Sequence, residues 1–225
     1  MSKPKYPISD KDMLELLHKY PFLRHRNVWT GEQVFHGKSR NLEDNYYKYW
    51  DGSGWEDLWK NRFLPRLFAA YDKLSKKDKR YFGFEQIKEK FGSLRIYMSG
   101  CPKDLDTIAE WISEYTCAYC GKEPRTSEGH RVIWTTGGWI THLCEDCARK
   151  ELLANGVPED KLEEELNEMK DVRDDGFAYK RYGKEKTILV KFKETPDNKW
   201  LEIDEEIELD KDKEREEFIK NLKGE

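Results

Sequence analysis

Two Cys-x-x-Cys pairs constrain this chain more than any other feature of its sequence. They are Cys117-Ala-Tyr-Cys120 and Cys144-Glu-Asp-Cys147, with 23 residues between them. Four thiolates can close a tetrahedral shell around one zinc ion and leave no position open for substrate or water. We therefore predict a structural zinc ion bound by Cys117, Cys120, Cys144 and Cys147. The alternative, four buried cysteines that act as small apolar side chains, is disfavoured by two such pairs in one short segment.

The spacing of the pairs is typical of a zinc ribbon, in which each pair lies in a knuckle at the tip of a hairpin. Gly121 follows the first pair directly and permits the left-handed turn that such a knuckle requires. His130 and His142 lie between the pairs, but His142 stands only two residues before Cys144, a poor spacing for binding the same ion. We expect both histidines around the site or at the surface. Cys101 is expected to be an inert thiol, because a reactive thiol requires a lowered pKa.

The distribution of charge narrows the classes of partner. The chain of 225 residues has a net charge of −4, but residues 151–225 alone hold 15 basic and 24 acidic side chains. A single-sign acidic region repels nucleic acid and suits a basic protein partner. The small basic excess of residues 1–116 falls short of the footprint of a DNA-binding domain.

The location in the cell follows from two absences in the sequence. No stretch approaches the roughly 18 apolar residues that cross a membrane, and the first residues lack the apolar core of a secretory signal. We expect a cytoplasmic protein. In that reducing compartment, cysteines serve as metal ligands more often than they form disulfides.

The hydrophobic pattern predicts an α+β fold with a core of large rings, since the chain holds 8 Trp, 12 Tyr and 10 Phe. The predicted helices cover residues 10–20 (with Ser9 as N-cap), 55–74 (interrupted by Pro65), 104–114, 148–154, 158–172 and 211–223. The predicted strands form a hairpin or bulged pair over 82–98 and a second pair, 187–193 and 201–209, with a turn at 195–198.

The composition turns acidic near residue 155, which suggests two domains. The first, residues 1–155, would be an α+β domain with the zinc-ribbon-like centre and flanking helices. The second, residues 156–225, would be an acidic helix/β-hairpin/helix appendage.

Four segments between residues 50 and 150 carry a resemblance to a known group of proteins. They are Gly54-Trp55-x-x-Leu58, Ile87-Lys-Glu-Lys-Phe-Gly-Ser-Leu-Arg-Ile-Tyr97, Thr116-Cys-x-x-Cys-Gly121 and Gly138-Trp-Ile-Thr-His-Leu-Cys-x-x-Cys-Ala148. Their order resembles that of small, functionally uncharacterised proteins of bacteria and their phages, which pair a Lys-Glu-Lys-Phe-Gly-x-Leu-Arg-x-Tyr segment with a Cys-x-x-Cys-Gly … Gly-Trp-x-x-x-Leu-Cys ending. The resemblance implies the fold and the metal, and it implies no activity.

The paired cysteines also resemble those of zinc-bearing HNH endonucleases. Glu128-Gly129-His130 loosely matches the acidic–His pair of those enzymes, but no Asn lies between His130 and Cys144, and Ala148 stands where a later His often occurs. Without a second metal-binding group, an ion that cleaves phosphate esters would lack ligands. Phosphate-binding loops, dinucleotide fingerprints and hydrolase motifs are also missing. We expect a protein without catalytic activity.

Two further sets of residues are candidates for contacts. Alternation along the hairpin would place Lys88, Lys90 and Arg95 on one polar face that could hold a phosphate or carboxylate, although a solvated hairpin face explains the same pattern. Trp134 and Trp139 lie in the loop between the cysteine pairs and are candidate partner contacts. The aromatic stretch 46–62 could stack on bases or fill the core.

The sequence thus favours a non-catalytic, zinc-stabilised binding protein that acts through a protein partner, for example a phage-encoded inhibitor of a host defence or regulatory complex. The alternative is a nucleic-acid-binding zinc-ribbon protein or a degenerate HNH-like nuclease. A weaker third option is the capture of a small anionic ligand at the face formed by Lys88, Lys90 and Arg95.

Overall fold

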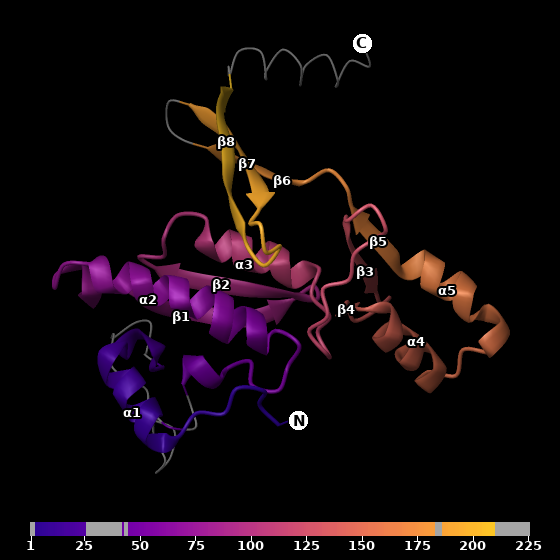
Figure 1. Ribbon diagram of the computed structural model, residues 1–225, viewed down its shortest axis with the longest axis horizontal. Coiled ribbons are helices and arrows are strands. Elements are labelled where there is room, and N and C mark those ends of the chain that lie inside the picture. The colour runs from indigo at the N-terminus through magenta and orange to yellow at the C-terminus, as the bar shows by residue number, and fades with distance from the viewer. Residues whose placement is uncertain (1–2, 26–41, 43–44, 183–185, 210–225) are drawn as a thin grey trace. The chain divides into compact units, whose positions relative to one another are not determined.

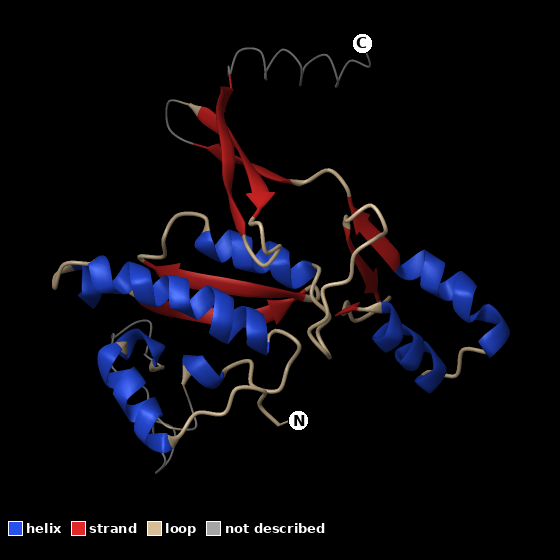
Figure 2. Ribbon diagram, in the orientation of Figure 1, coloured by secondary structure: helices blue, strands red, loops and turns tan. Residues whose placement is uncertain are grey.

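The computed structural model describes residues 3–25, 42, 45–182 and 186–209, and it forms two compact units, residues 1–172 and 173–225. The chain has the predicted α+β character, with helices and small sheets in unit 1 and a sheet in unit 2 (Figures 1 and 2). The predicted helix over 211–223 lies outside the described residues. Short 3-10 segments occur at Pro21–Leu23, Tyr46–Lys48, Asp78–Arg80 and Glu159–Lys161.

The first helix of unit 1, α1 (Asp10–Lys19), begins and ends as its sequence predicts. The Ser9 hydroxyl accepts a hydrogen bond from the backbone N–H of Asp12 at 3.2 Å, which satisfies one of the free donors of the first turn. Pro21 follows and begins a 3-10 turn in place of a further helical turn.

The predicted helix over 55–74 forms over residues 56–73, but its geometry changes midway. Leu58–Phe63 is π-helical, and α2 (Leu64–Lys73) continues it as an α-helix. Pro65 has no N–H to offer the carbonyl of Asn61, and its ring would collide with that carbonyl in a regular α-helix. The wider π-helical turn accommodates the proline without ending the helix.

The predicted hairpin over 82–98 forms from β1 (Gly83–Lys90) and β2 (Ser93–Ser99), which pair antiparallel. Phe91 lies between the two strands. It forms the two-residue turn with Gly92, and both residues have positive φ, 55° and 75°. Such a pair of left-handed residues matches the twist of the flanking strands.

Helix α3 (Leu105–Glu114) lies along β2 and closes the outer edge of this two-stranded sheet (Figure 1). The Ser113 hydroxyl accepts from the N–H of Leu94 at 2.9 Å, and the Glu110 carboxylate accepts from the N–H of Ile96 at 3.0 Å. Two side chains of one helix therefore satisfy backbone donors that would otherwise form an open strand edge.

The part of unit 1 that holds the cysteine pairs is a small sheet with two helices. The sheet has the order β4-β3-β5, formed by β3 (Arg131–Thr135), β4 (His142–Leu143) and β5 (Lys170–Arg173). Helices α4 (Glu145–Ala154) and α5 (Leu162–Met169) lie side by side next to it (Figure 2).

Unit 1 ends later than the change in composition near residue 155. The helix predicted over 158–172 stops at Met169, and the chain then enters β5, which pairs with β3. Leu166 also joins the apolar cluster around the cysteines. These contacts keep residues 156–172 with the first unit, although their composition resembles that of the second.

Unit 2 is an antiparallel sheet of β6 (Phe177–Tyr182), β7 (Thr187–Glu194) and β8 (Leu201–Leu209), in that order. The two predicted strands and the turn between them are confirmed, and β6 was not predicted. Cross-strand ion pairs, Arg181–Glu206 at 3.0 Å and Lys191–Glu205 at 2.9 Å, use part of the acidic charge within the sheet. Charged side chains along an edge strand such as β8 also discourage pairing with other chains.

Large rings fill the core of unit 1, as the composition predicts. Phe22 contacts Phe82 edge-on with 4.9 Å between ring centroids, and Trp59 stacks on Phe63 at 5.0 Å. The indole N–H of Trp59, which is fully buried, donates to the Tyr46 carbonyl at 2.8 Å. The aromatic stretch 46–62 therefore contributes several of its rings to the core.

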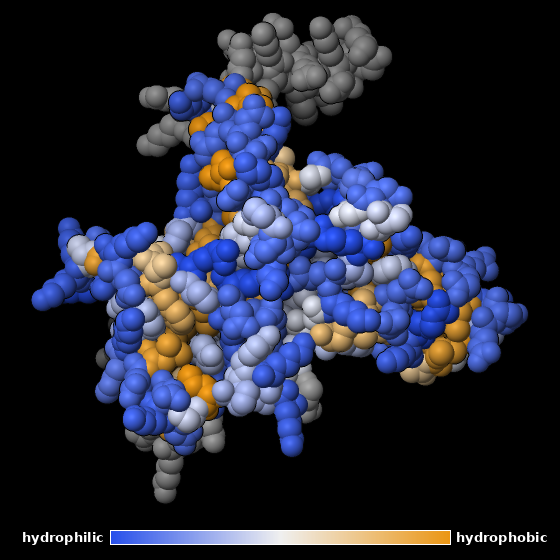
Figure 3. Space-filling model, viewed as in Figure 1, coloured by the Kyte–Doolittle hydropathy of each residue, from blue (hydrophilic) through white to orange (hydrophobic). Residues whose placement is uncertain are grey.

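The outer surface shown in Figure 3 is mostly hydrophilic, in keeping with the 38% of charged residues. No helix within the described ranges combines the length and the apolar character that crossing a bilayer demands.

A buried carboxylate fastens the N-terminal segment to the start of the π-helical segment. Glu56 is fully buried and accepts hydrogen bonds from the backbone N–H groups of Lys5, Tyr6 and Gly52 at 2.8–3.0 Å. The Lys60 ammonium lies 3.0 Å from the same carboxylate. Burial acts to raise the pKa of Glu56, but these hydrogen bonds outweigh it and hold the pKa at about 2, below its ordinary 4.5.

We expect stability to fall as pH drops from about 4.5 to about 2, because the depressed pKa of Glu56 means that its ionised form stabilises the fold above that window. The expected loss is on the order of 2 kcal/mol. Urea unfolding followed by tryptophan fluorescence measures it. Glu56→Gln should be less stable than the wild type at pH 7, and its free energy of unfolding should change less over this pH window. Glu15→Gln, on the exposed side of α1, should match the wild type. An equal slope in Glu56→Gln would contradict this assignment.

Candidate metal centre

Four sulfur atoms from two distant segments meet in one cluster. The Sγ atoms of Cys117, Cys120, Cys144 and Cys147 all lie within 4.8 Å of one another, and those of Cys120 and Cys144 are 3.6 Å apart. A tetrahedral ion with metal–sulfur bonds of about 2.3 Å separates its ligands by roughly 3.8 Å. The separation is too long for a disulfide, whose bond is about 2.05 Å. The predicted ligand set therefore suits a tetrahedral metal ion.

The first pair forms the predicted knuckle. The N–H of Cys117 donates to the Lys122 carbonyl at 2.8 Å, and the N–H of Gly121 returns to the Cys117 carbonyl at 2.9 Å. Gly121 has φ of 78°, the left-handed conformation expected from its position. The N–H of Ala118 donates to the carbonyl of His142 at 2.9 Å, so the knuckle is fixed to β4.

A zinc ribbon would place the second pair in a knuckle at a hairpin tip, but this pair does not form one. Cys144 is the N-cap of α4, and Cys147 lies in the first turn of that helix. The spacing i, i+3 places both sulfurs on one face of a helix as readily as in a knuckle. Helix formers from Ala148 onward, and the acidic Glu145 and Asp146 in the first turn, favour the helix. The centre is thus a knuckle, a β-hairpin and a helix N-terminus.

Burial opposes the ionisation of the clustered thiols. Burial raises the pKa of Cys144 to about 11 and also raises that of Cys147. Burial opposes ionisation of Cys117 too, but backbone N–H groups of Cys120, Cys144 and Tyr119 outweigh it and lower that pKa. Four crowded thiols cannot all ionise unless a cation compensates their charge, and a bound metal ion supplies that compensation.

Apolar side chains enclose the buried side of the cluster. Cys117 and Cys144 are nearly inaccessible, and they pack with Val132, Trp134, Leu143, Ala148 and Leu166. Cys120 is the least buried of the four ligands. A shell of four sulfurs in such surroundings leaves no open position at the ion.

A backbone contact joins the knuckle to a segment more than sixty residues earlier. The N–H of Gly54 donates to the Ala118 carbonyl at 2.7 Å. A Cβ at position 54 would lie 1.9 Å from the Cys117 carbonyl oxygen, so only glycine permits this approach. The neighbouring Trp55 indole donates to the Thr116 carbonyl at 3.4 Å. Gly54-Trp55 in the sequence therefore marks a contact with the knuckle, which the pattern alone did not reveal.

A buried ion group joins the same region to the π-helical segment. The Glu123 carboxylate, three residues after Cys120, pairs with Arg62 and with Arg131, whose guanidinium lies 3.4 Å away. The Arg131 side chain is only 2% exposed. Removing one member of such a group leaves charge buried without its partner, so the group fixes the knuckle relative to the helix.

The other residues near the cysteines lie outside the cluster, as predicted. His130 is exposed, and His142 is partly buried with its Nδ1 3.0 Å from the Thr135 hydroxyl. Glu128, of the acidic–His pair, is exposed in the same turn as His130. Burial raises the pKa of Cys101 to about 12, which makes it a poor nucleophile. Within the described residues, the four cysteines are the group of side chains placed to hold an ion.

The candidate anion face is partly occupied by other interactions. Lys88 lies directly opposite Arg95 across the hairpin, as alternation requires. The Arg95 guanidinium lies 3.5 Å from Glu110 and 3.9 Å from Glu114, both on α3. Lys88 hydrogen-bonds Gln86 at 2.7 Å, and the Lys90 ammonium lies over the Phe91 ring. Two carboxylates already neutralise Arg95, which weakens the case for an anion there.

The two loop tryptophans have different roles. Trp134 is 6% exposed and packs in the apolar cluster, with the Lys170 ammonium 6.0 Å from its ring centroid. It holds the loop in place and is not available to a partner. Trp139 is 80% exposed, so it alone of the two keeps the candidate contact role.

Comparison with protein-family models, with curated proteins and with solved structures finds no match to this chain. The resemblance to bacterial and phage proteins stays a prediction.

We expect Cys120→Ser to lose bound metal and to destabilise unit 1 by several kcal/mol, because a structural ion contributes folding energy directly. Cys120 is the best ligand to remove, since it contributes least to the apolar packing. Metal content per chain and thermal unfolding measure the effect. Cys101→Ser, the same substitution outside the cluster, should retain one metal ion per chain, and equal metal content in both variants would show that the cluster is not the site.

Proposed function

We propose that this chain is a non-catalytic binding protein, stabilised by a structural zinc ion, that acts by engaging a protein partner. Tetrahedral sulfur-only shells select zinc or iron centres, and zinc is the ion that forms closed structural sites without redox chemistry. Cys117, Cys120, Cys144 and Cys147 would hold the zinc. Because all four positions are sulfur, the ion supports the fold and has no place for a substrate.

The exposed Trp139 is the observation that carries the binding role. A tryptophan that is 80% exposed in a folded chain exposes a large apolar surface to water at a cost, and such residues concentrate at interfaces. Its loop is well held: the Thr136 hydroxyl donates to the Trp139 carbonyl at 2.7 Å and accepts from the Thr141 N–H at 2.9 Å. A rigid, presented aromatic loses little entropy on binding.

A protein partner suits the charge of the chain better than a nucleic acid does. The net charge is −4, and the acidic excess lies in residues 151–225. The resemblance to bacterial and phage proteins extends the proposal to a biological setting, a phage-encoded antagonist of a host defence or regulatory complex that works in the cytoplasm.

Co-purification from the native host, followed by mass spectrometry and elemental analysis, tests the proposal. We expect one protein partner in stoichiometric amount with the wild type and with Tyr81→Ala, and its loss with Trp139→Ala. Tyr81 is the matched control, because it is an exposed aromatic (70%) outside the Trp139 loop. Elemental analysis should read zinc.

Two results would contradict the proposal. Recovery of DNA or RNA, with retention that weakens steeply as salt rises, would support the nucleic-acid-binding alternative. Iron in place of zinc would contradict the assignment of the ion.

A further inference from the structure

The tip of the β1–β2 hairpin carries an aromatic side chain in a strained backbone conformation. Phe91 has φ of 55°, which is rare for a bulky residue, and its side chain is 62% exposed. Exposure returns no burial energy to offset that strain. The two-residue turn requires this backbone conformation, and it presents the Phe91 ring at the surface.

The loop between the cysteine pairs contacts the hairpin tip. Gly92 forms a parallel bridge with Thr141, the residue before His142. A Cβ on Gly92 would lie 2.8 Å from the His142 ring, so the two segments are in close contact. The hairpin tip therefore lies against the segment that leads to the second cysteine pair.

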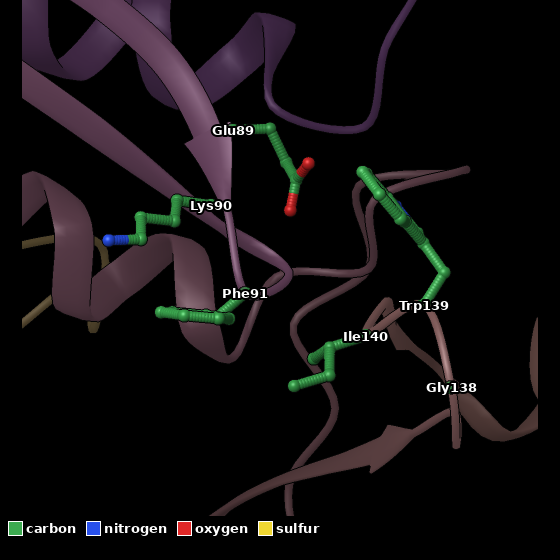
Figure 4. A pocket seen from close by; sticks show the side chains of 6 residues that line it. All are labelled: Glu89, Lys90, Phe91, Gly138, Trp139 and Ile140. Carbon is green, nitrogen blue, oxygen red and sulfur yellow. The ribbon is translucent and has the colours of Figure 1, made fainter.

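A pocket opens between the same two segments. It has a volume of about 270 Å³ and is lined by Glu89, Lys90 and Phe91 of the hairpin and by Gly138, Trp139 and Ile140 of the loop (Figure 4). Trp139 forms one wall and Phe91 lies on the other side. Both walls belong to unit 1, and both are held by the contacts described above.

The one acidic group in this lining is directed toward Trp139. Figure 4 shows the Glu89 carboxylate pointing into the space in front of the Trp139 ring. Its Oε1 accepts from the N–H of Gly92 at 2.7 Å, and its Oε2 has no hydrogen-bond donor among the described residues. The Lys90 ammonium lies 4.9 Å from the Phe91 ring centroid and points away from Trp139, which leaves the Trp139 side of the pocket negative.

We propose that this pocket binds an arginine side chain of a protein partner. The guanidinium would stack on the Trp139 ring and donate to the Glu89 carboxylate. This inference rests on the proposed function, because it names the chemistry by which the partner is recognised.

The composition of the pocket favours this occupant over others. Ring faces attract cations, and a planar guanidinium can stack on an indole while it donates to a carboxylate, which an ammonium does less well. A volume of about 270 Å³ is below the usual range for small-molecule sites, roughly 300–1,000 Å³, and suits a single side chain. The negative charge of Glu89 would repel the phosphate backbone of a nucleic acid.

Titration of the metal-loaded protein with the peptide acetyl-Gly-Arg-Gly-amide tests the inference, with the Trp139 indole N–H resonance as the readout. We expect a saturable shift. The matched peptide with citrulline, which has the same shape but no charge, should bind at least about tenfold more weakly.

Glu89→Gln should weaken the arginine peptide by about tenfold and leave the citrulline peptide unchanged. This variant keeps an oxygen that can accept from the Gly92 N–H, and metal content confirms that it folds. Gln86→Ala, on the same strand but outside the lining, should bind like the wild type.

Equal binding of the arginine and citrulline peptides, or equal binding by Glu89→Gln, would overturn the inference. So would a stronger shift of the Trp139 signal by a short oligonucleotide that persists in Glu89→Gln. The two proposals fail separately: a co-purified partner that is lost with Trp139→Ala but retained by Glu89→Gln would keep the proposed function and refute arginine recognition.

Discussion

The four-sulfur cluster is the constraint on which the rest of unit 1 depends. It joins a knuckle at residues 117–121 to the first turn of α4, across a loop of 23 residues that returns as a β-hairpin. Around it, the Ala118 N–H donates to the His142 carbonyl, and the Gly54 N–H donates to the Ala118 carbonyl of the knuckle. Desolvation and mutual repulsion favour the protonated thiols, so four thiolates at this place require a cation to balance their charge.

The candidate binding surface is an extension of this centre. His142, two residues before the candidate ligand Cys144, lies with its ring against Gly92 of the hairpin turn, and the loop that precedes it presents Trp139. The cysteine cluster, the left-handed turn and the exposed rings of Phe91 and Trp139 therefore lie in connected segments of unit 1. An ion at the cysteine cluster would fix the relative positions of the two walls of the pocket.

The features that depend on local chemistry could be predicted from the sequence. The features that depend on contacts between distant residues could not. The ligands followed from cysteine spacing, α1 from its Ser9 cap and Pro21, and β7 and β8 from alternation. Cys-x-x-Cys fits a knuckle and a helical turn equally well, and only the helix-forming residues after the second pair distinguish the two. Trp134 and Trp139 look alike in sequence, and the packing of the loop alone makes one a core residue and the other exposed. A bulky residue such as Phe91 gives no local signal of a left-handed turn, so its position there could not be predicted.

Amide hydrogen exchange of the metal-loaded and the chelator-stripped protein tests the central claim most directly. If the ion holds the knuckle, removing it should lower the protection of the Ala118 and Gly54 amides by at least about 100-fold. The amides of β7 in unit 2 should be unaffected and serve as the internal reference. Unchanged protection of Ala118 and Gly54 after complete removal of the metal would contradict the account, because the centre would then be held by packing alone.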